Sequence, residues 1–173
     1  LEKNQLEAGY GDGKGWSRFP VQKSDEYPSP PELHGELKIS LPGETLARLV
    51  ERSAYAVSEE TTRASLNGVF LHGSPLQLSF VATDGHRLAR ATCKGSYGDL
   101  TREGVIIPAR ALSAMSRTSA EATSPVEIRI ADGKGHAGFV AQVGEFRVQV
   151  TARLLQGPYP NYEQVIPKDN PRS

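Results

Sequence analysis

The amino-acid sequence predicts an α+β domain in which two helices pack side by side on one face of antiparallel sheets. The main evidence is an internal repeat: from Glu36 onward, one strand, one helix and three strands follow one another, and the same order then recurs. The turns between successive strands are short, which is typical of antiparallel pairing. A chain of 173 residues that is 38% hydrophobic is long enough for one such domain and additional segments.

Residues 1–35 differ from the rest of the chain. A glycine-rich turn at 9–15 precedes an expected strand at 16–21, and the proline-rich segment 27–31 is typical of a stiff, extended connector. The segment contains too few apolar residues to bury a core of its own. We therefore expect 1–35 to be the tail of a preceding domain plus a linker, and 36–168 to be the main domain.

The first repeat begins with a strand at 37–41, where apolar and polar residues alternate. Pro42 then suits the first position of a helix, with Glu44 in its first turn. Apolar residues recur at helical spacing and form one face of this helix: Leu46, Leu49, Val50, Ala54 and Val57. Arg48 and Arg52 lie on the opposite side of the helix.

Three strands complete the first repeat, at 66–72, 76–83 and 87–93. In the second of them, apolar residues occupy every second position, which is the period of a half-buried strand. The dipeptide Asp84-Gly85 that follows is a strong signal of a two-residue hairpin loop. The sequence therefore predicts that the second and third strands pair with each other.

The second repeat has the same order. Residues 105–107 predict a short strand, and Pro108 opens a helix whose outer side carries Arg110 and Arg117, seven residues apart. Three alternating strands complete the repeat, at 126–130, 137–141 and 146–150. Both helices are thus expected to turn an arginine-bearing side away from the core.

Charge and cysteine content narrow the classes of function. The 20 basic and 20 acidic residues cancel, whereas proteins that grip nucleic-acid phosphates usually have a basic bias. Any contact with DNA must therefore come from a local basic stripe, or DNA must be held by shape. Cys93 is the only cysteine, which excludes an intramolecular disulfide and a thiolate metal cluster and fits a reducing cytoplasm best.

Residues 83–87, Thr-Asp-Gly-His-Arg, bring together an acid, an imidazole and a guanidinium, as a catalytic or metal-binding cluster would. Asp-Gly is, however, first of all a turn sequence, and the other histidines have no ligand-like spacing. We therefore expect a plain hairpin, with no metal and no cofactor. A small hydrolase centred on Asp84 and His86 remains the alternative.

Residues 80–89, Phe-Val-Ala-Thr-Asp-Gly-His-Arg-Leu-Ala, closely resemble the signature of the bacterial DNA polymerase III beta subunit, the ring-shaped sliding clamp. Four other segments resemble this family in the same order along the chain: 18–19 with 25–28, 66–68, 105–108 and 157–167. The resemblance implies the DNA clamp fold, whose domains each contain the repeat described above. It also implies a non-catalytic function, in which a head-to-tail dimeric ring encircles duplex DNA and tethers the polymerase.

In this family the helices line the central hole, which would turn Arg48, Arg52, Arg110 and Arg117 toward the DNA phosphates. The alternative is that these arginines only solvate exposed helix faces. Glu44 and Glu51 partly cancel the first pair of arginines, so the second helix is the better candidate for contact with DNA.

The resemblance also implies a pocket that binds short peptides of the polymerase III catalytic subunit, the clamp loader and repair polymerases. Carried over position by position, its lining is Leu66, Thr83, Gly85, His86, Arg87, Leu88, Pro160, Gln164 and Val165. The apolar members would form a socket for a leucine or phenylalanine of the partner, and the polar ones would orient the peptide backbone. Gln164 stands where many relatives carry a basic residue. For Leu66 and Leu88, an ordinary core position is the alternative.

By this resemblance the chain starts late in the first clamp domain, and 169–173 begin the linker to a third. We therefore expect half of the peptide pocket, and one or both ring interfaces, to lie outside it. The chain is expected to be a segment of a longer clamp or a divergent short homologue. A stand-alone module that sequesters clamp partners without encircling DNA is a further alternative.

Overall fold

The computed structural model describes residues 5–13, 15–22, 25, 27, 29, 31, 33, 37–60, 62–74, 76–95, 97, 104–131, 133 and 135–167. The chain forms two compact units, Leu1–Pro31 and Glu32–Ser173. The first unit contains a hairpin of β1 (Gln5–Tyr10) and β2 (Gly15–Pro20). The strand predicted at 16–21 is thereby confirmed. The linker start predicted at 169–173 lies outside the described residues.

The second unit contains one strand, one helix and three strands, twice over, as the sequence predicts. In chain order these elements are β3 (Leu37–Leu41), α1 (Gly43–Ala54), β4 (Gly68–Ser74), β5 (Gln77–Thr83), β6 (Leu88–Lys94), β7 (Val105–Pro108), α2 (Ala109–Ala120), β8 (Val126–Ile130), β9 (His136–Val143) and β10 (Phe146–Arg153). Two short 3-10 turns, η2 (Ala64–Leu66) and η4 (Tyr162–Val165), lie outside this repeat. No helix among the described residues is long and apolar enough to cross a membrane.

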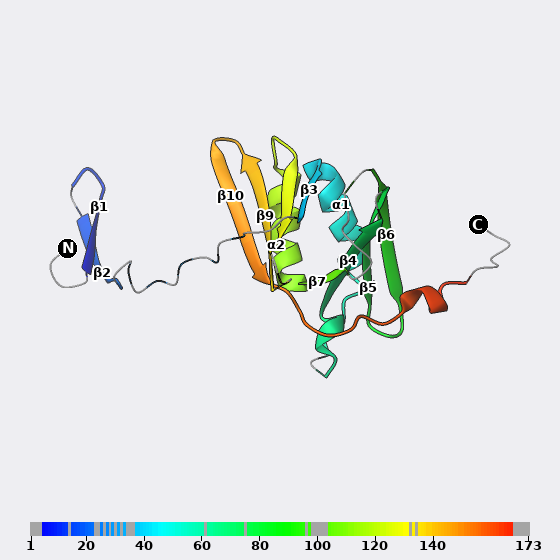
Figure 1. The fold of residues 1–173 in the computed structure, drawn as a ribbon. Helices are drawn as coiled ribbons and strands as arrows, with labels where there is room; N and C mark the ends of the chain where they lie inside the picture. Colours follow the sequence, from blue (N-terminus) through cyan, green and yellow to red (C-terminus); the bar gives the residue numbers. More distant parts are fainter. Residues whose placement is uncertain are drawn as a thin grey trace. The chain divides into compact units, whose positions relative to one another are not determined.

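The strands form two four-stranded antiparallel sheets, in the orders β10-β9-β8-β3 and β6-β5-β4-β7 (Figure 1). Each sheet combines the last three strands of one repeat with the first strand of the other. Thus β3 pairs with β8, with Ile39 opposite Ile128, and β7 pairs with β4, with Ile107 opposite Val69. Neither repeat therefore completes its own sheet, and the two must form together.

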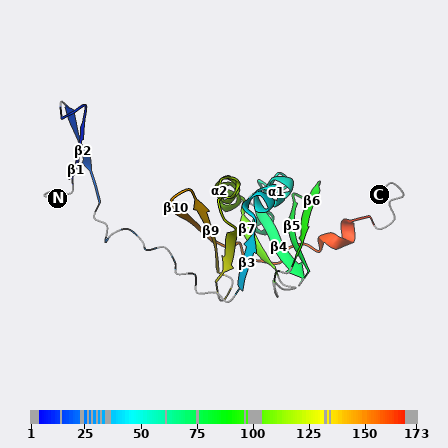
Figure 2. The ribbon, with the colours of Figure 1, turned by 90° about the horizontal axis from the view of Figure 1, so that it is seen from above.

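The helices lie side by side, and Figure 2 shows both nearly end-on. Helix α1 packs on β4, β5 and β6, whereas α2 packs mainly on β7, β9 and β10. Their inner faces carry apolar residues that are almost completely buried: Leu46, Leu49 and Val50 from α1, and Leu112 and Met115 from α2. These side chains join one continuous core with the inward-facing residues of both sheets. The α+β fold class is thereby confirmed.

Three details differ from the sequence-based expectation. Pro42 is the N-cap residue of α1, and the helix itself begins at Gly43. The helix ends at Ala54, so Val57 lies in the loop that follows it. Leu66, expected at the start of a strand, belongs instead to η2, and the strand β4 begins at Gly68. The short local bonds of η2, from Leu66 N to Arg63 O and from Asn67 N to Ala64 O, replace strand pairing here.

The start of α1 approaches the end of α2 very closely. A Cβ atom added to Gly43 would overlap the carbonyl oxygen of Ser119 and would lie 3.0 Å from Cβ of Ala122. Ser119 is itself only 1% exposed, so its backbone has little room to retreat. Glycine at position 43 thus allows the two helices to pack as tightly as they do.

Replacing Gly43 by alanine is expected to lower the free energy of unfolding by about 1–3 kcal/mol, because overpacking forces the two helix ends apart. Urea denaturation followed by circular dichroism measures this change. Gly135→Ala is the matched control, since a Cβ there meets no atom within 4 Å. Equal stability of both variants would contradict the close helix approach.

Candidate functional site

The signature run folds into the loop that joins β5 to β6. Thr83 pairs with Leu88, so the loop has four residues rather than the two predicted from Asp84-Gly85. The longer loop arises because Asp84 Oδ1 accepts hydrogen bonds from the backbone N–H groups of both His86 and Arg87, each at 2.9 Å. Gly85 adopts φ +93°, a conformation that favours glycine.

Asp84 also binds the side chain of Arg87, whose Nε donates to Oδ2 at 2.9 Å. The backbone hydrogen bonds from Arg87 and His86, followed by the Arg87 side chain, lower the pKa of Asp84 to about 2. Both carboxylate oxygens are thus engaged in bracing the loop. Among the described residues, no group of three His, Cys, Asp or Glu side chains is placed to hold a metal ion.

His86 and Arg87 line a hollow of about 610 Å³ where α1 ends and α2 begins. The guanidinium carbon of Arg87 lies 5.8 Å from the ring centre of Tyr55, and Tyr55 is 60% exposed. The remaining lining comes from the end of α1, the loop after it and the first residue of α2: Ala54, Val57, Ser58, Glu59, Glu60, Asp84 and Ala109. Arg87 therefore lies between Asp84 and the end of α1.

The turn η2 lies beside this hairpin. A Cβ atom added to Gly85 would lie 3.9 Å from Nη1 of Arg63, which precedes η2. A Cβ atom added to Gly157 would lie 3.9 Å from Cβ of Ser65 in η2. Leu66 is only 3% exposed, and its carbonyl oxygen accepts a hydrogen bond from Ser58 N at 3.0 Å. The turn thus lies between the hairpin and the segment that follows β10.

That segment, residues 154–165, is called the strap. Figure 1 shows it leaving β10, crossing the end of the β6-β5-β4-β7 sheet and ending in η4 beyond β6. Leu155 N donates to Ile106 O at 2.9 Å, and the Tyr159 hydroxyl donates to Val81 O at 3.3 Å. Burial raises the pKa of Tyr159 to about 12, so its hydroxyl remains a donor at all physiological pH values.

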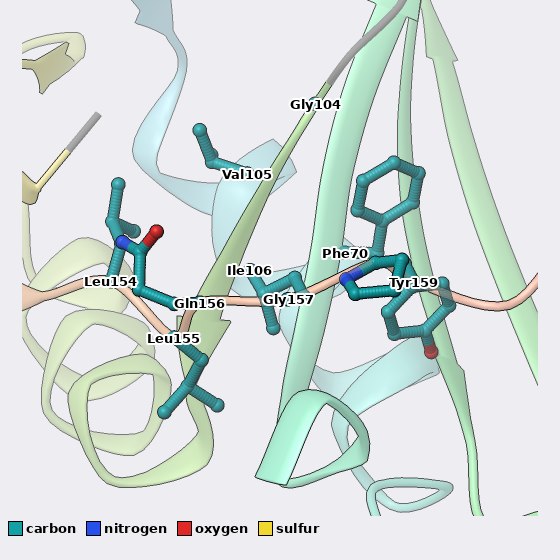
Figure 3. Close-up of a pocket in the computed structure, with 10 residues that line it drawn as sticks. Phe70, Gly104, Val105, Ile106, Leu154, Leu155, Gln156, Gly157 and Tyr159 are labelled. Carbon is teal, nitrogen blue, oxygen red and sulfur yellow. The ribbon is translucent and has the colours of Figure 1, made fainter. Parts of the chain in front are cut away.

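Between these attachments the strap spans a hollow of about 310 Å³. Figure 3 shows Leu154 and Leu155 at one end of it, and Phe70 and Tyr159 at the other. Its floor is formed by the start of β7 and by Phe70 of β4. The phenyl rings of Phe70 and Tyr159 are stacked, with centroids 4.8 Å apart and planes 7° from parallel.

The structure brings together the three segments that carry the predicted peptide-binding residues: η2, the β5–β6 hairpin and the strap. Val165 is 69% exposed and Leu88 is half-buried, so both present apolar surface. Leu66 is buried, which agrees with the alternative interpretation that it is an ordinary core residue. His86 and Arg87 differ from the rest, because none of the described residues that line their hollow belongs to the strap.

Sequence reasoning missed the residues that hold the strap on the sheet: Phe70, His72, Tyr159 and Tyr162. A partial signal exists in β4, where Phe70 and His72 alternate with the core residues Val69 and Leu71 and so point to the opposite face. Nothing in the local sequence indicates which segment covers that face.

The four arginines predicted to face DNA are all exposed on their helices. Arg48 Nη1 lies 3.5 Å from Glu44 Oε1, so the cancellation expected in α1 exists for this residue. Arg48 and Arg52 also line a hollow of about 390 Å³ between α1 and β6. Arg110 and Arg117 lie on α2, with Arg117 in its last turn, where the helix dipole favours a cation.

Comparison with known protein families gives a match to the model described as "DNA polymerase III beta subunit, central domain" over residues 40–161. The Beta sliding clamp of Caulobacter vibrioides is 33% identical over 156 residues, which cover 88% of this chain and 38% of that protein. The Beta sliding clamp of Escherichia coli K12 is 30% identical over 158 residues, or 90% of this chain and 41% of that protein. The chain thus spans about two-fifths of the length of these relatives.

Solved structures agree with these matches. The DNA polymerase III subunit beta of Pseudomonas aeruginosa has a TM-score of 0.83 and 29% identity, with 97% of this chain and 44% of that chain covered. A sliding clamp from Bartonella birtlesii bound to griselimycin has a TM-score of 0.81 and 28% identity, with 91% of this chain and 42% of that chain covered.

The lowered pKa of Asp84 predicts how the hairpin responds to acid. Protection of the Arg87 amide from hydrogen exchange is expected to be complete above the ordinary aspartate pKa of about 3.9 and to be lost as the pH falls through about 2. NMR measurements between pH 1 and 6 test this. In Asp84→Asn the transition should disappear; a transition that persists there would show that another group controls it.

Proposed function

Because the chain belongs to the DNA polymerase III beta subunit family, we propose that it forms part of a cytoplasmic DNA sliding clamp and has no catalytic activity of its own. In the complete ring, which we propose to be a head-to-tail homodimer, duplex DNA is encircled without regard to sequence. Partners such as the polymerase III catalytic subunit, the clamp loader and repair polymerases then bind through short peptides. Residues 36–168 serve as the central domain and the β1–β2 hairpin belongs to the preceding one.

The observation that carries the peptide-binding part is the convergence of η2, the β5–β6 hairpin and the strap at one end of a sheet. Leu88 and Val165 offer apolar surface there, and Pro160 adds a rigid one on the strap. An exposed apolar surface that is backed by a rigid sheet suits a leucine or phenylalanine anchor of an extended peptide. Thr83 and Gln164 supply polar groups at its border.

The position of Arg87 refines this proposal. Its guanidinium is engaged by Asp84 and faces Tyr55, so it borders the socket from the side of the helices. We propose that His86 and Arg87 contact the peptide where it leaves the socket and passes over the hairpin. Gly85 permits a close approach of the peptide backbone at this point.

The DNA-facing part rests on the exposed arginines of the two helices. Arg110 and Arg117 are the stronger pair, because Arg48 already pairs with Glu44. A ring retains DNA by topology, so a few phosphate contacts are enough to guide sliding. This agrees with a net charge of zero for the chain.

Replacing Val165 by aspartate is expected to weaken binding of a fluorescent peptide with a leucine–phenylalanine anchor at least tenfold, since a carboxylate would be buried in the socket. Fluorescence anisotropy or NMR titration measures the Kd. Phe146→Asp is the matched control: this side chain is 74% exposed, at the start of β10 in the other sheet. An unchanged Kd in Val165→Asp, or an equal loss in both variants, contradicts the socket.

Replacing Arg110 and Arg117 together by alanine is expected to weaken binding to linear duplex DNA at low salt. The magnitude of the negative slope of log K against log salt concentration should decrease by about 1.8, because each lost phosphate contact contributes about 0.9. Arg147 and Arg153, both exposed on β10, provide a control with the same change of charge. If the control pair reduces the slope equally, the effect is one of net charge, and the helices do not face DNA.

A further inference from the structure

Four side chains fasten the far end of the strap to the sheet: Phe70, His72, Tyr159 and Tyr162, here called the strap anchor. Phe70 stacks on His72, with centroids 4.9 Å apart, and on Tyr159, with centroids 4.8 Å apart. The ring of Tyr162 lies 5.7 Å from that of His72, and its hydroxyl is 2.6 Å from His72 Nε2. Tyr162 is only 5% exposed, although it lies in the short turn η4.

The strap anchor lies beyond the part of the strap that spans the hollow. At Gln156–Pro158 the strap passes over the hollow of about 310 Å³ (Figure 3). Gly157 in its middle has φ +114°. The backbone attachment at Leu155 N and Ile106 O lies before this hollow, on the side of β10. Beyond the hollow, the strap anchor attaches the chain to β4 and β5.

Tyr162 is placed between the residues of the proposed socket. Its backbone N–H donates to Pro160 O at 2.8 Å, and it opens η4, which ends with Gln164 and Val165. A shift of Tyr162 along or away from the sheet therefore moves Pro160 and Val165 with it. Leu88 belongs to β6 and would not follow, so the socket would lose its shape.

We propose that His72 and Tyr162 are positioning residues of the peptide socket: their hydrogen bond holds η4 against β4 and thereby sets the distance of Pro160 and Val165 from Leu88. This rests on the proposed peptide-binding function and adds two residues that do not themselves touch the peptide. It also assigns a role to a histidine that lies outside the signature run.

The protonation of His72 is coupled to its burial in the strap anchor. Arg90 on β6 faces this pair, with its guanidinium carbon 5.9 Å from the Tyr162 ring centre, and Glu163 on η4 acts in the opposite direction. Tyr159 and Phe70 supply the remaining surroundings. Burial first, and then the charge of Arg90, lower the pKa of His72 below its ordinary value of about 6.5, and Glu163 offsets part of this.

The sign of the effect follows from linkage. His72 binds a proton less readily with the strap in place than when it is released, so lowering the pH below about 6.5 favours release. Above that value the imidazole is neutral in both states, and the strap anchor has its full strength. Peptide binding is therefore expected to weaken several-fold between about pH 7 and pH 5, in parallel with loosening of the strap.

The test uses Tyr162→Phe, which keeps the ring and removes the hydroxyl, and His72→Gln, which keeps a polar side chain that does not titrate. For each protein the peptide Kd is measured from pH 5 to pH 8, together with hydrogen exchange of the Leu155 and Tyr162 amides. Tyr162→Phe is expected to raise the Kd about fivefold at pH 7.5 and to speed exchange at Tyr162. His72→Gln should flatten the pH profile. His136→Ala, on β9 of the other sheet, is the control and should match the wild type.

Different outcomes separate this inference from the function on which it rests. If the wild type binds peptide and both variants match it in Kd and pH profile, the positioning role is overturned and the socket stands. If exchange at Tyr162 is also unchanged in Tyr162→Phe, the hydrogen bond does not hold the strap. If no protein binds peptide, wild type included, the proposed function fails and the positioning role fails with it. A pH profile that persists in His72→Gln overturns the role of His72 in the pH dependence.

Discussion

The exchange of first strands between the two repeats is the constraint on which the rest of the structure depends. Because β3 completes the sheet of the second repeat and β7 completes that of the first, each sheet needs both halves of the chain. The helices must then lie side by side, and Gly43 lets them approach closely. The same exchange places β7 beside β4, where Ile106 can receive the strap. The floor of the candidate site is thus a product of the whole fold.

Much of the fold can be predicted from the sequence, because its elements are short and clearly separated. Alternation of apolar residues predicts the strands, helical spacing predicts α1 and α2, and Pro42 and Pro108 mark the points where each helix begins. The pairing of β3 with β8 and of β7 with β4 cannot be predicted in this way. Alternation shows that a strand has a buried face, but it does not identify the strand beside it.

In the candidate site, too, local features can be predicted from the sequence and long-range contacts cannot. Residues within one short run, such as Asp84 and Gly85, can be interpreted locally, although the carboxylate extends the loop from two residues to four. His72 and Tyr162 are 90 residues apart in sequence. Tyr162 lies in segment 157–167, which resembles the clamp family, but nothing in that segment identifies His72 as its partner. Their contact exists because the strap returns across β4, which depends on the length and course of a segment without regular structure. Such contacts follow from tertiary structure alone.

The two faces of the β6-β5-β4-β7 sheet carry different surroundings. In β4, Val69 and Leu71 point into the core beneath the helices, whereas Phe70 and His72 point to the strap. Helix α1, with Arg48 and Arg52, and the proposed peptide socket therefore lie on opposite sides of this sheet, whereas α2, with Arg110 and Arg117, packs mainly on β7, β9 and β10. A peptide bound beside the strap would not have to displace DNA from the helices.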